Sequence, residues 1–309
     1  MKQETPHITP KIFYNERRKF LKLGAGGLVS LLSVENLLAQ IDSKKLNFND
    51  ELHAYSASPI TPKEIATTYN NFYEFGFGKN DPVLYARNLI TSPWNISVEG
   101  EIEKPFSISL PELIAKMRLV KRVYRFRCVE AWSMVIPWIG FELREFIEFA
   151  KPSKNAKFIR FTTLYDPKQM PMQRASFQAI KFPYQEALRL DEAKIPLVLL
   201  AVGMYDEILT PQNGAPLRLV VPWKYGYKSI KTINKIEFLS QQPISTWEAE
   251  NPREYGFYGN VDPEVSHPRW SQSSERVIGS RGRIKTLYLN GYDKEVQHLY
   301  TGLDRKLLY

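Results

Sequence analysis

Short segments in which apolar and polar residues alternate are spread along this chain, a pattern typical of β-strands with one buried face. Strands of this kind are expected over residues 121–128, 156–165, 215–223 and 232–240. Residues 195–204 form a continuous apolar run, IPLVLLAVGM, that is short enough to be a fully buried strand. The pattern therefore predicts several short strands.

Helices are expected where a proline or a repeating apolar face marks them. Pro62 and Pro111 each lie close to the expected start of a helix, and two short strands are expected between residues 94 and 110. A third helix is expected over residues 140–150, where every third or fourth residue is apolar. Its buried face would consist of Leu143, Phe146, Ile147 and Ala150.

The connections between these elements are long and irregular. Residues 70–82 are loop-like, with two glycines and an Asp-Pro pair, and the segment after residue 240 is rich in Pro, Trp and Tyr. We find no internal repeat, and no G-x-G-x-x-G motif follows a strand. The sequence therefore predicts a mixed α+β fold in a single domain, with a functional site built largely from loops.

Composition and charge narrow the range of partners. The chain has 309 residues, of which 43% are hydrophobic and 24% charged, as in globular proteins. The formal net charge is +9, and residues 1–39 contribute +3 of it through six basic and three acidic side chains. The remaining excess suits anionic small molecules or a membrane surface. Nucleic acid is not an expected partner, because no basic run is interleaved with stacking aromatic residues.

The N-terminal segment has the features of an export signal. An Arg-Arg pair at residues 17–18 precedes an apolar run over residues 23–34. This run is too short to span a bilayer, since a spanning helix needs roughly 20 residues. The pattern R-R-x-F-L-K resembles the twin-arginine signal, although Glu16 stands where Ser or Thr is usual. An amphipathic N-terminal helix of a cytosolic protein is the alternative.

The export interpretation divides the chain into two parts. We expect residues 1–39 to be a twin-arginine signal peptide that is cleaved near Ala39, and residues 40–309 to be the mature domain. The twin-arginine translocase moves proteins that are already folded, so a cofactor can be installed before export. The expected location of the mature domain is the periplasm.

Cys128 is the only cysteine and cannot form an intrachain disulfide. Three interpretations remain: an inert buried residue, a nucleophile or a metal ligand. Arg125 and Arg127 favour a thiolate by charge, but alternation along the strand would place both on the opposite face. A nucleophile needs a base, and none of the four histidines lies in a catalytic pattern. One cysteine with four scattered histidines also excludes a zinc motif.

The segment that contains Cys128 resembles the molybdenum-binding segment of the sulfite-oxidase fold. It reads RCVEAWSMVIPWIGFEL over residues 127–143. Within that superfamily the whole chain is similar to the catalytic molybdopterin subunits of the periplasmic protein-methionine-sulfoxide reductases. Further matching segments cover residues 69–76, 213–231 and 251–276. The resemblance implies a molybdopterin-binding fold of the sulfite-oxidase type, with mixed sheets and long irregular connections in one domain.

The resemblance also implies a set of site residues. Cys128 matches the thiolate that binds molybdenum. The positions that match contacts to the pterin cofactor are Asn70, Tyr73, Glu74, Thr163, Asn213, Arg218, Ser229, Ile230 and Lys231. Without the resemblance, the basic residues in this set could be ordinary exposed strand charges, Asn213-Gly214 a simple turn, and Thr163 only a strand former.

The residue types suit the cofactor chemically. A phosphate group binds backbone amides, a hydroxyl, and Arg or Lys, which Ser229, Arg218 and Lys231 can supply. Lys224 and Lys228 are expected to add positive potential nearby, and Asn70 and Asn213 can satisfy the amide-like edges of the pterin. Family membership implies one molybdenum on a single pterin without an appended nucleotide.

Glu130 lies two residues after Cys128 and has two interpretations. It could be a carboxylate on the surface or at a helix start, or it could point into the same cleft as Cys128 and handle protons in catalysis. A neutral amide beside the metal would suit an uncharged sulfoxide better than sulfite. The sequence does not place Asn71 in that position.

The implied activity is reduction of methionine sulfoxide residues in oxidised periplasmic proteins. Mo(IV) would take the oxygen atom, and electrons would come from the quinone pool through a membrane haem b partner subunit. Because the substrate is a residue of another protein, an open mouth at the metal is expected. The rival interpretations are a molybdenum enzyme of the same fold acting on sulfite or small S- or N-oxides, an exported metal-free binding protein, and a thiol-dependent hydrolase.

Overall fold

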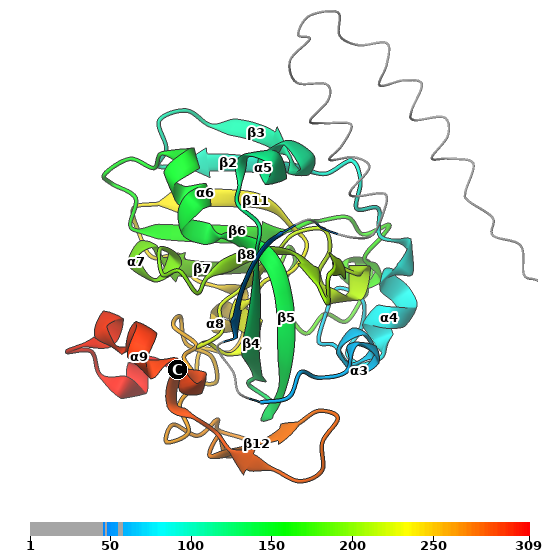
Figure 1. The fold of residues 1–309 in the computed structure, drawn as a ribbon, viewed down its shortest axis with the longest axis vertical. Coiled ribbons are helices and arrows are strands. Elements are labelled where there is room, and N and C mark those ends of the chain that lie inside the picture. Colours follow the sequence, from blue (N-terminus) through cyan, green and yellow to red (C-terminus); the bar gives the residue numbers. More distant parts are fainter. Residues whose placement is uncertain (1–45, 47, 55–57) are drawn as a thin grey trace, which may run out of the picture.

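Strands from distant parts of the chain combine into two β-sheets in the computed structural model, which describes residue 46 and residues 48–54 and 58–309 (Figure 1). The strands of the larger sheet are β1 (Asn49–Ala54), β4 (Val120–Cys128), β5 (Trp132–Glu142), β8 (Leu199–Met204), β9 (Glu207–Ile208), β10 (Arg218–Val220), β12 (Ser274–Val277) and β13 (Ile284–Lys285). The strands of the smaller sheet are β2 (Asn95–Gly100), β3 (Phe106–Ser109), β6 (Phe158–Thr163), β7 (Gln185–Arg189) and β11 (Ile233–Leu239). The predicted signal peptide lies outside the described residues and stays a prediction.

The helices are short. They are α3 (Lys63–Thr68), α4 (Asp81–Tyr85), α5 (Leu110–Lys116), α6 (Leu143–Ala150), α7 (Leu190–Ala193), α8 (Thr246–Glu250) and α9 (Asp293–Val296). Two 3₁₀ turns, η3 (Pro211–Asn213) and η4 (Gly226–Lys228), belong to the segment that carries most of the predicted cofactor contacts. In the described part of the chain no helix is long and apolar enough to cross a membrane.

Both sheets contain parallel and antiparallel pairs, as the α+β prediction requires. In the larger sheet β4 pairs antiparallel with β5 and parallel with β1. β5 continues antiparallel to β8 and parallel to β12. The smaller sheet has the order β3-β2-β11-β6-β7, with a parallel pair only between β11 and β2. Figure 1 shows this smaller sheet above the long β4–β5 pair, with α3 and α4 beside that pair.

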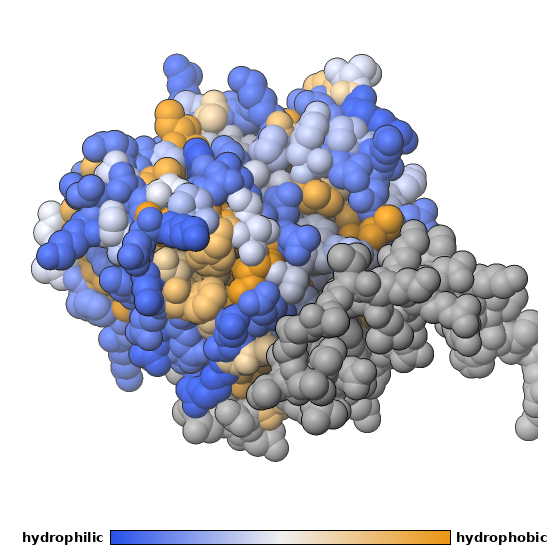
Figure 2. Space-filling model, turned by 90° about the horizontal axis from the view of Figure 1, so that it is seen from above, coloured by the Kyte–Doolittle hydropathy of each residue, from blue (hydrophilic) through white to orange (hydrophobic). Residues whose placement is uncertain are grey.

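Buried apolar side chains from both sheets form one main cluster, so the two sheets share a core. A smaller cluster consists of Phe72, Phe75, Ala86, Leu89 and Met170. Figure 2 shows polar and charged side chains over most of one face of the molecule, with apolar patches between them. The prediction of one mixed α+β domain is confirmed.

The expected half-buried character of β4 is wrong. Arg122 and Arg127 are both buried, with 4% and 0% of their surface exposed. Each guanidinium has a buried carboxylate partner, because Arg122 contacts Glu142 at 3.0 Å and Arg127 contacts Glu275 at 2.8 Å. A buried charge is tolerated when it is paired in this way, so alternation alone misjudges this strand.

The segment after Cys128 contains a strand that the pattern did not predict. All residues of β5 are buried, and Pro137 lies in its middle. Proline normally argues against an inner strand, because it has no N–H for the ladder. β5 extends to Glu142, so α6 begins at Leu143 and not at residue 140. The predicted apolar face of this helix is confirmed by the burial of Leu143, Phe146, Ile147 and Ala150.

Candidate active site

A cavity of about 480 Å³ lies where the loop after α3, the end of β4 and the segment from η3 to β11 meet. Every residue that the sequence analysis assigned to the site lines this cavity. These residues are Asn70, Tyr73, Glu74, Cys128, Glu130, Thr163, Asn213, Arg218, Ser229, Ile230 and Lys231. The fold therefore brings them together, while their individual roles remain predictions.

A tight turn between β4 and β5 presents Cys128 to the cavity. Cys128 pairs with Trp132 across the ladder, and the backbone N–H of Ala131 donates to the carbonyl of Cys128 at 3.1 Å. Ala131 has a φ of 60°, so the turn passes through the left-handed region. The turn also brings the backbone N–H of Glu130 to 3.4 Å from Cys128 Sγ. Glu130 lines the cavity with 32% of its side chain exposed, and it lies in a turn and not at a helix start. Its role in proton handling stays a prediction.

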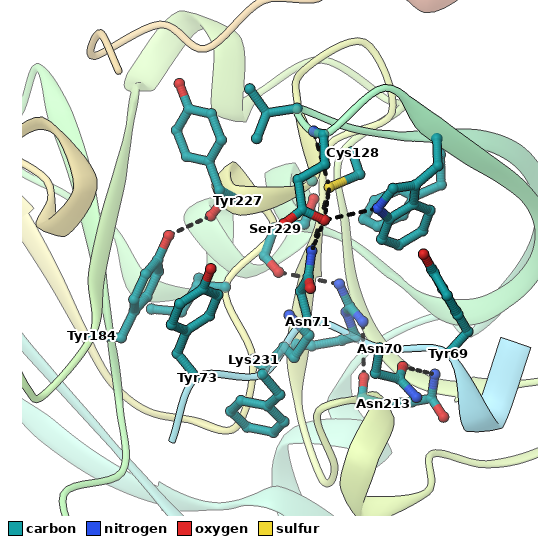
Figure 3. Close-up of a pocket in the computed structure, with 18 of the residues that line it drawn as sticks. Tyr69, Asn70, Asn71, Tyr73, Cys128, Tyr184, Asn213, Tyr227, Ser229 and Lys231 are labelled. Carbon is teal, nitrogen blue, oxygen red and sulfur yellow. Dashed lines mark hydrogen bonds between the residues drawn. The ribbon is translucent and has the colours of Figure 1, made fainter. Parts of the chain in front are cut away.

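Three polar side chains surround the Glu130 carboxylate. Its Oε2 accepts hydrogen bonds from Lys79 Nζ at 2.6 Å, from Trp132 Nε1 at 3.0 Å and from Asn71 Nδ2 at 3.1 Å. Asn71 Nδ2 also lies 3.4 Å from Cys128 Sγ, and Asn71 Oδ1 accepts from Lys79 at 2.5 Å. Asn71, which the sequence did not place, thus belongs to the site beside the thiol (Figure 3).

The thiol and the carboxylate have pKa values shifted in opposite directions. Burial raises the pKa of Cys128 to about 12, and the negative charge of Glu130 adds to this shift. Burial also raises the pKa of Glu130, but hydrogen bonds from Lys79, Trp132 and Asn71 outweigh burial and lower it overall. Without a metal the thiol is therefore protonated at neutral pH beside an ionised carboxylate. A bound metal ion would reverse this for the thiol.

Cationic side chains gather at the other side of the cavity. Arg218 is buried, and its guanidinium donates to the backbone carbonyls of Asn213 at 2.8 Å and Ser229 at 3.1 Å. Burial lowers the pKa of Arg218 to about 9. Burial and the neighbouring Arg218 lower the pKa of Lys231 to about 7. An anion bound between these two basic groups would stabilise their charged forms, so the arrangement suits an anionic ligand.

The backbone around Lys231 is fixed by close packing. Gly214 has a φ of 98°, and a Cβ at this position would lie 2.8 Å from Cβ of Lys231. Only glycine fits both constraints without strain. Thr163 Oγ1 donates to the carbonyl of Lys231 at 2.8 Å. Asn213-Gly214 is therefore more than a surface turn, since it presses against the residue that carries the expected phosphate contact.

The two asparagines expected at the pterin edges bond each other. Asn213 Nδ2 donates to Asn70 Oδ1 at 3.1 Å and to the carbonyl of Ala66 at 2.9 Å. Glu74 is buried nearby, and burial raises its pKa to about 7. A carboxyl group in this environment can accept hydrogen bonds from the amino and N–H groups of a polar heterocycle.

The expectation that Lys224 and Lys228 add positive potential to the site is wrong. Lys224 is buried and contacts Glu192 at 2.6 Å. Lys228 is also buried and pairs with Glu186. Neither lysine lines the cavity. Each charge is neutralised by a carboxylate. The basic side chains that line the cavity are Arg218, Lys231 and Arg269.

Sequence reasoning missed Lys79 and an extensive aromatic lining. Lys79 carries no recognisable signal, because it lies in the loop FGFGKNDP far in sequence from Glu130. The aromatic side chains that line the cavity in addition to Tyr73 are Tyr69, Phe72, Phe126, Trp132, Trp138, Tyr184, Tyr227, Trp247, Tyr255 and Trp270. Figure 3 shows tyrosines around the site, with Cys128 on one side and Lys231 and Asn213 on the other.

These residues fit a molybdopterin cofactor. Cys128 offers one thiolate, and the described residues contain no group of three or more His, Cys, Asp or Glu that could hold a metal ion. A single protein thiolate suits a metal whose other ligands are the dithiolene sulfurs of a pterin. Arg218 and Lys231 suit the phosphate at the far end of that cofactor. No histidine lines the cavity in the described part of the chain, so the thiol-dependent hydrolase lacks its base.

Comparison with known proteins agrees with this geometry. Residues 84–247 match the family model of the oxidoreductase molybdopterin binding domain. The chain is 54% identical to the protein-methionine-sulfoxide reductase catalytic subunit MsrP of Campylobacter jejuni. The alignment of 306 residues covers 97% of this chain and 99% of the relative. The chain belongs to the MsrP family. Among solved structures, the sulfane dehydrogenase SoxCD from Paracoccus pantotrophus superposes with a TM-score of 0.44 at 13% identity, over 87% of this chain and 68% of that chain.

Proposed function

We propose that this protein reduces methionine sulfoxide residues in other proteins. The observation that carries the proposal is one cavity with a single cysteine thiol at one side and two basic side chains, Arg218 and Lys231, at the other, in a chain of the MsrP family. The reaction consumes one sulfoxide, two electrons and two protons, and yields one thioether and one water. Bound molybdopterin would supply the redox couple that accepts the sulfoxide oxygen.

Different side chains of the cavity would bind different parts of the cofactor. Cys128 would ligate the molybdenum, and Arg218, Lys231 and the Ser229 hydroxyl would hold the phosphate. Glu74 would accept hydrogen bonds from the pterin. The cofactor would be a single pterin with one molybdenum, as the family resemblance implies.

Asn71 and Glu130 would act on the substrate side of Cys128. Asn71 presents a neutral amide donor beside the thiol, which suits the oxygen of an uncharged sulfoxide. Glu130 is within reach of the same space and could pass on the protons that water formation requires. Sulfite fits this arrangement less well, because Lys79 and the cavity-lining Arg269 are each already paired with a carboxylate, Glu130 and Glu254.

The proposals for the cellular location and the electron donor rest on the sequence and on the resemblance to the MsrP family. The Arg-Arg motif at residues 17–18 supports export through the twin-arginine translocase to the periplasm. The relative is named a catalytic subunit, which supports a partner subunit here as well. We propose that this partner is a membrane haem b protein that passes electrons from the quinone pool, and that the substrates are oxidised periplasmic proteins.

The test is a substrate comparison with a reduced viologen dye as electron donor. Dye oxidation would be followed with a peptide that contains methionine sulfoxide and with dimethyl sulfoxide. Sulfite oxidation would be followed in a separate assay with ferricyanide as the electron acceptor. The proposal predicts turnover of the sulfoxides and formation of the reduced peptide by mass spectrometry. Turnover of sulfite alone would move the protein to the sulfite-oxidising alternative.

A further inference from the structure

The aromatic lining of the cavity continues outward to two exposed phenylalanines. Tyr73 and Trp247 line the cavity with ring centroids 5.2 Å apart. Tyr73 also contacts Phe77 at 5.6 Å, and Phe77 contacts Phe177 at 6.0 Å. We call these four side chains the aromatic rim. Phe77 is 43% exposed and Phe177 is 71% exposed, so the rim passes from the cavity wall to the surface.

The loop around Phe77 is built to hold its side chain at the surface. Gly76 and Gly78 flank Phe77, and a Cβ at either glycine would meet the Asp81 side chain within 3.0 Å. The backbone N–H of Gly78 donates to Asp81 Oδ2 at 2.7 Å. The two glycines thus let the backbone close tightly on Asp81, and the exposed position of Phe77 follows from a fixed loop.

The loop around Phe177 is anchored on both sides. Gln178 Nε2 donates to the carbonyls of Met172 at 3.2 Å and Gln173 at 3.1 Å. The backbone N–H of Lys181 donates to Glu250 Oε1 at 3.0 Å. An anchored loop that leaves a large aromatic ring in water, next to a second exposed ring, indicates a contact surface for another molecule.

We infer that the aromatic rim binds the apolar residues that flank a methionine sulfoxide in an extended substrate polypeptide, an inference that rests on the proposed function. A side chain can enter the cavity only if its own backbone lies at the mouth, and the neighbouring residues must then cross the rim. The centroid distances from Tyr73 to Phe77 and from Phe77 to Phe177 together match the length of about three or four extended residues, at roughly 3.3–3.6 Å per residue. The rim therefore selects apolar residues within about four positions of the sulfoxide.

The test compares Phe177→Ser with the wild-type holoenzyme on three substrates. These are an 11-residue peptide with a central methionine sulfoxide and leucines at nearby positions, the same peptide with serines in place of the leucines, and dimethyl sulfoxide. Phe177→Tyr serves as the conservative variant. Leu303→Ser serves as the control, because Leu303 is also an exposed apolar side chain (43%) but neither lines the cavity nor belongs to the aromatic rim.

Loss of one aromatic contact predicts a KM for the leucine peptide that is about five- to tenfold higher in Phe177→Ser. Turnover of dimethyl sulfoxide and of the serine peptide should stay within about twofold. Phe177→Tyr should behave like the wild type, and Leu303→Ser should change nothing.

Three results would overturn the inference: an equal effect on all three substrates, no effect on any, or conversion of a dimer to a monomer by Phe177→Ser in sedimentation, which would make the rim an interface between two copies. A wild-type protein that reduces no sulfoxide at all would instead contradict the proposed function itself.

Discussion

The ammonium of Lys79 lies 2.6 Å from Oε2 of Glu130, in the cavity wall beside Cys128. The same ammonium lies 2.5 Å from Oδ1 of Asn71. One cation thus sets the position of the carboxylate and directs the NH₂ group of Asn71 toward the thiol. The contact with Glu130 joins segments that are 51 positions apart in sequence, so this side of the site depends on the tertiary fold.

Replacement of Lys79 by Met should weaken the fold in a pH-dependent way. The pKa of Glu130 is held below its ordinary value, so its ionic contacts stabilise the folded state above about pH 4.5. This contribution is lost as the pH falls through the lowered pKa. Lys79→Met should therefore reduce the free energy of unfolding by about 1 kcal/mol at pH 7, and by progressively less toward pH 3. Urea titrations at several pH values measure it, with Lys79→Arg as the control, and a difference that does not depend on pH would contradict it.

The thiol of Cys128 should be poorly reactive in protein prepared without cofactor. Its pKa of about 12 leaves little thiolate at pH 8, so alkylation by iodoacetamide should be about 100-fold slower than for an exposed cysteine. Glu130→Gln removes one cause of the raised pKa and should accelerate alkylation. Mass spectrometry of the alkylated protein measures both rates. Rapid alkylation of the wild type at pH 7 would argue against the protonated thiol.

Gly214→Ala should destabilise the protein and loosen the cofactor site. The new Cβ meets Lys231 and the backbone has a positive φ, so a loss of about 1–3 kcal/mol is expected. Gly282→Ala is a matched control, because Gly282 has a φ of 81° but no atom within 4 Å of its Cβ position. Thermal unfolding should separate the two variants, and molybdenum content should fall only in Gly214→Ala. Equal behaviour of the two would show that the contact with Lys231 is unimportant.

Lys231 should make the cofactor-free protein more stable as the pH rises from about 7 toward 10. Its pKa falls from 10.5 to about 7 on folding, so the unfolded chain binds more protons in this window. Glu74 acts in the opposite direction at lower pH, between about 4.5 and 7, because folding raises its pKa. Lys231→Met should flatten the rise above pH 7 and also reduce molybdenum retention.

Chemical denaturation of the cofactor-free proteins between pH 6 and pH 10 checks this prediction. The exposed Lys294→Met is the control, and it should retain the slope of the wild type. A Lys231→Met variant whose stability still rises with pH as in the wild type would show that this ammonium does not carry the effect.

The sequence predicted the features that depend on local pattern or on the family resemblance. The strand that ends at Cys128 and the apolar face of α6 are local. The resemblance located Cys128 and the nine expected cofactor contacts in the cavity, and Glu130 was proposed from its spacing to Cys128. Long-range charge pairs were not predictable in this way. Arg127 and Glu275 are separated by 148 positions, and Lys79 and Glu130 by 51.

The other misjudged elements have the same physical origin. Pro137 lies in the middle of a buried strand because the flanking strands and core hold that segment in place, against its local preference. Lys224 appeared to be a cation of the site, but Glu192 neutralises it. In both cases tertiary contacts determine the structure, and a sequence pattern that spans only a few residues does not predict such contacts.

The most direct test of the account is the molybdenum content of the purified holoenzyme, wild type beside Cys128→Ser, measured by elemental mass spectrometry. The account predicts close to one molybdenum per wild-type chain and a large loss in the variant, because Cys128 is the proposed metal ligand and the described residues contain no cluster of His, Cys, Asp or Glu that could replace it. A wild-type protein that stays free of molybdenum, although it is produced with ample molybdenum and active cofactor synthesis, would contradict the account.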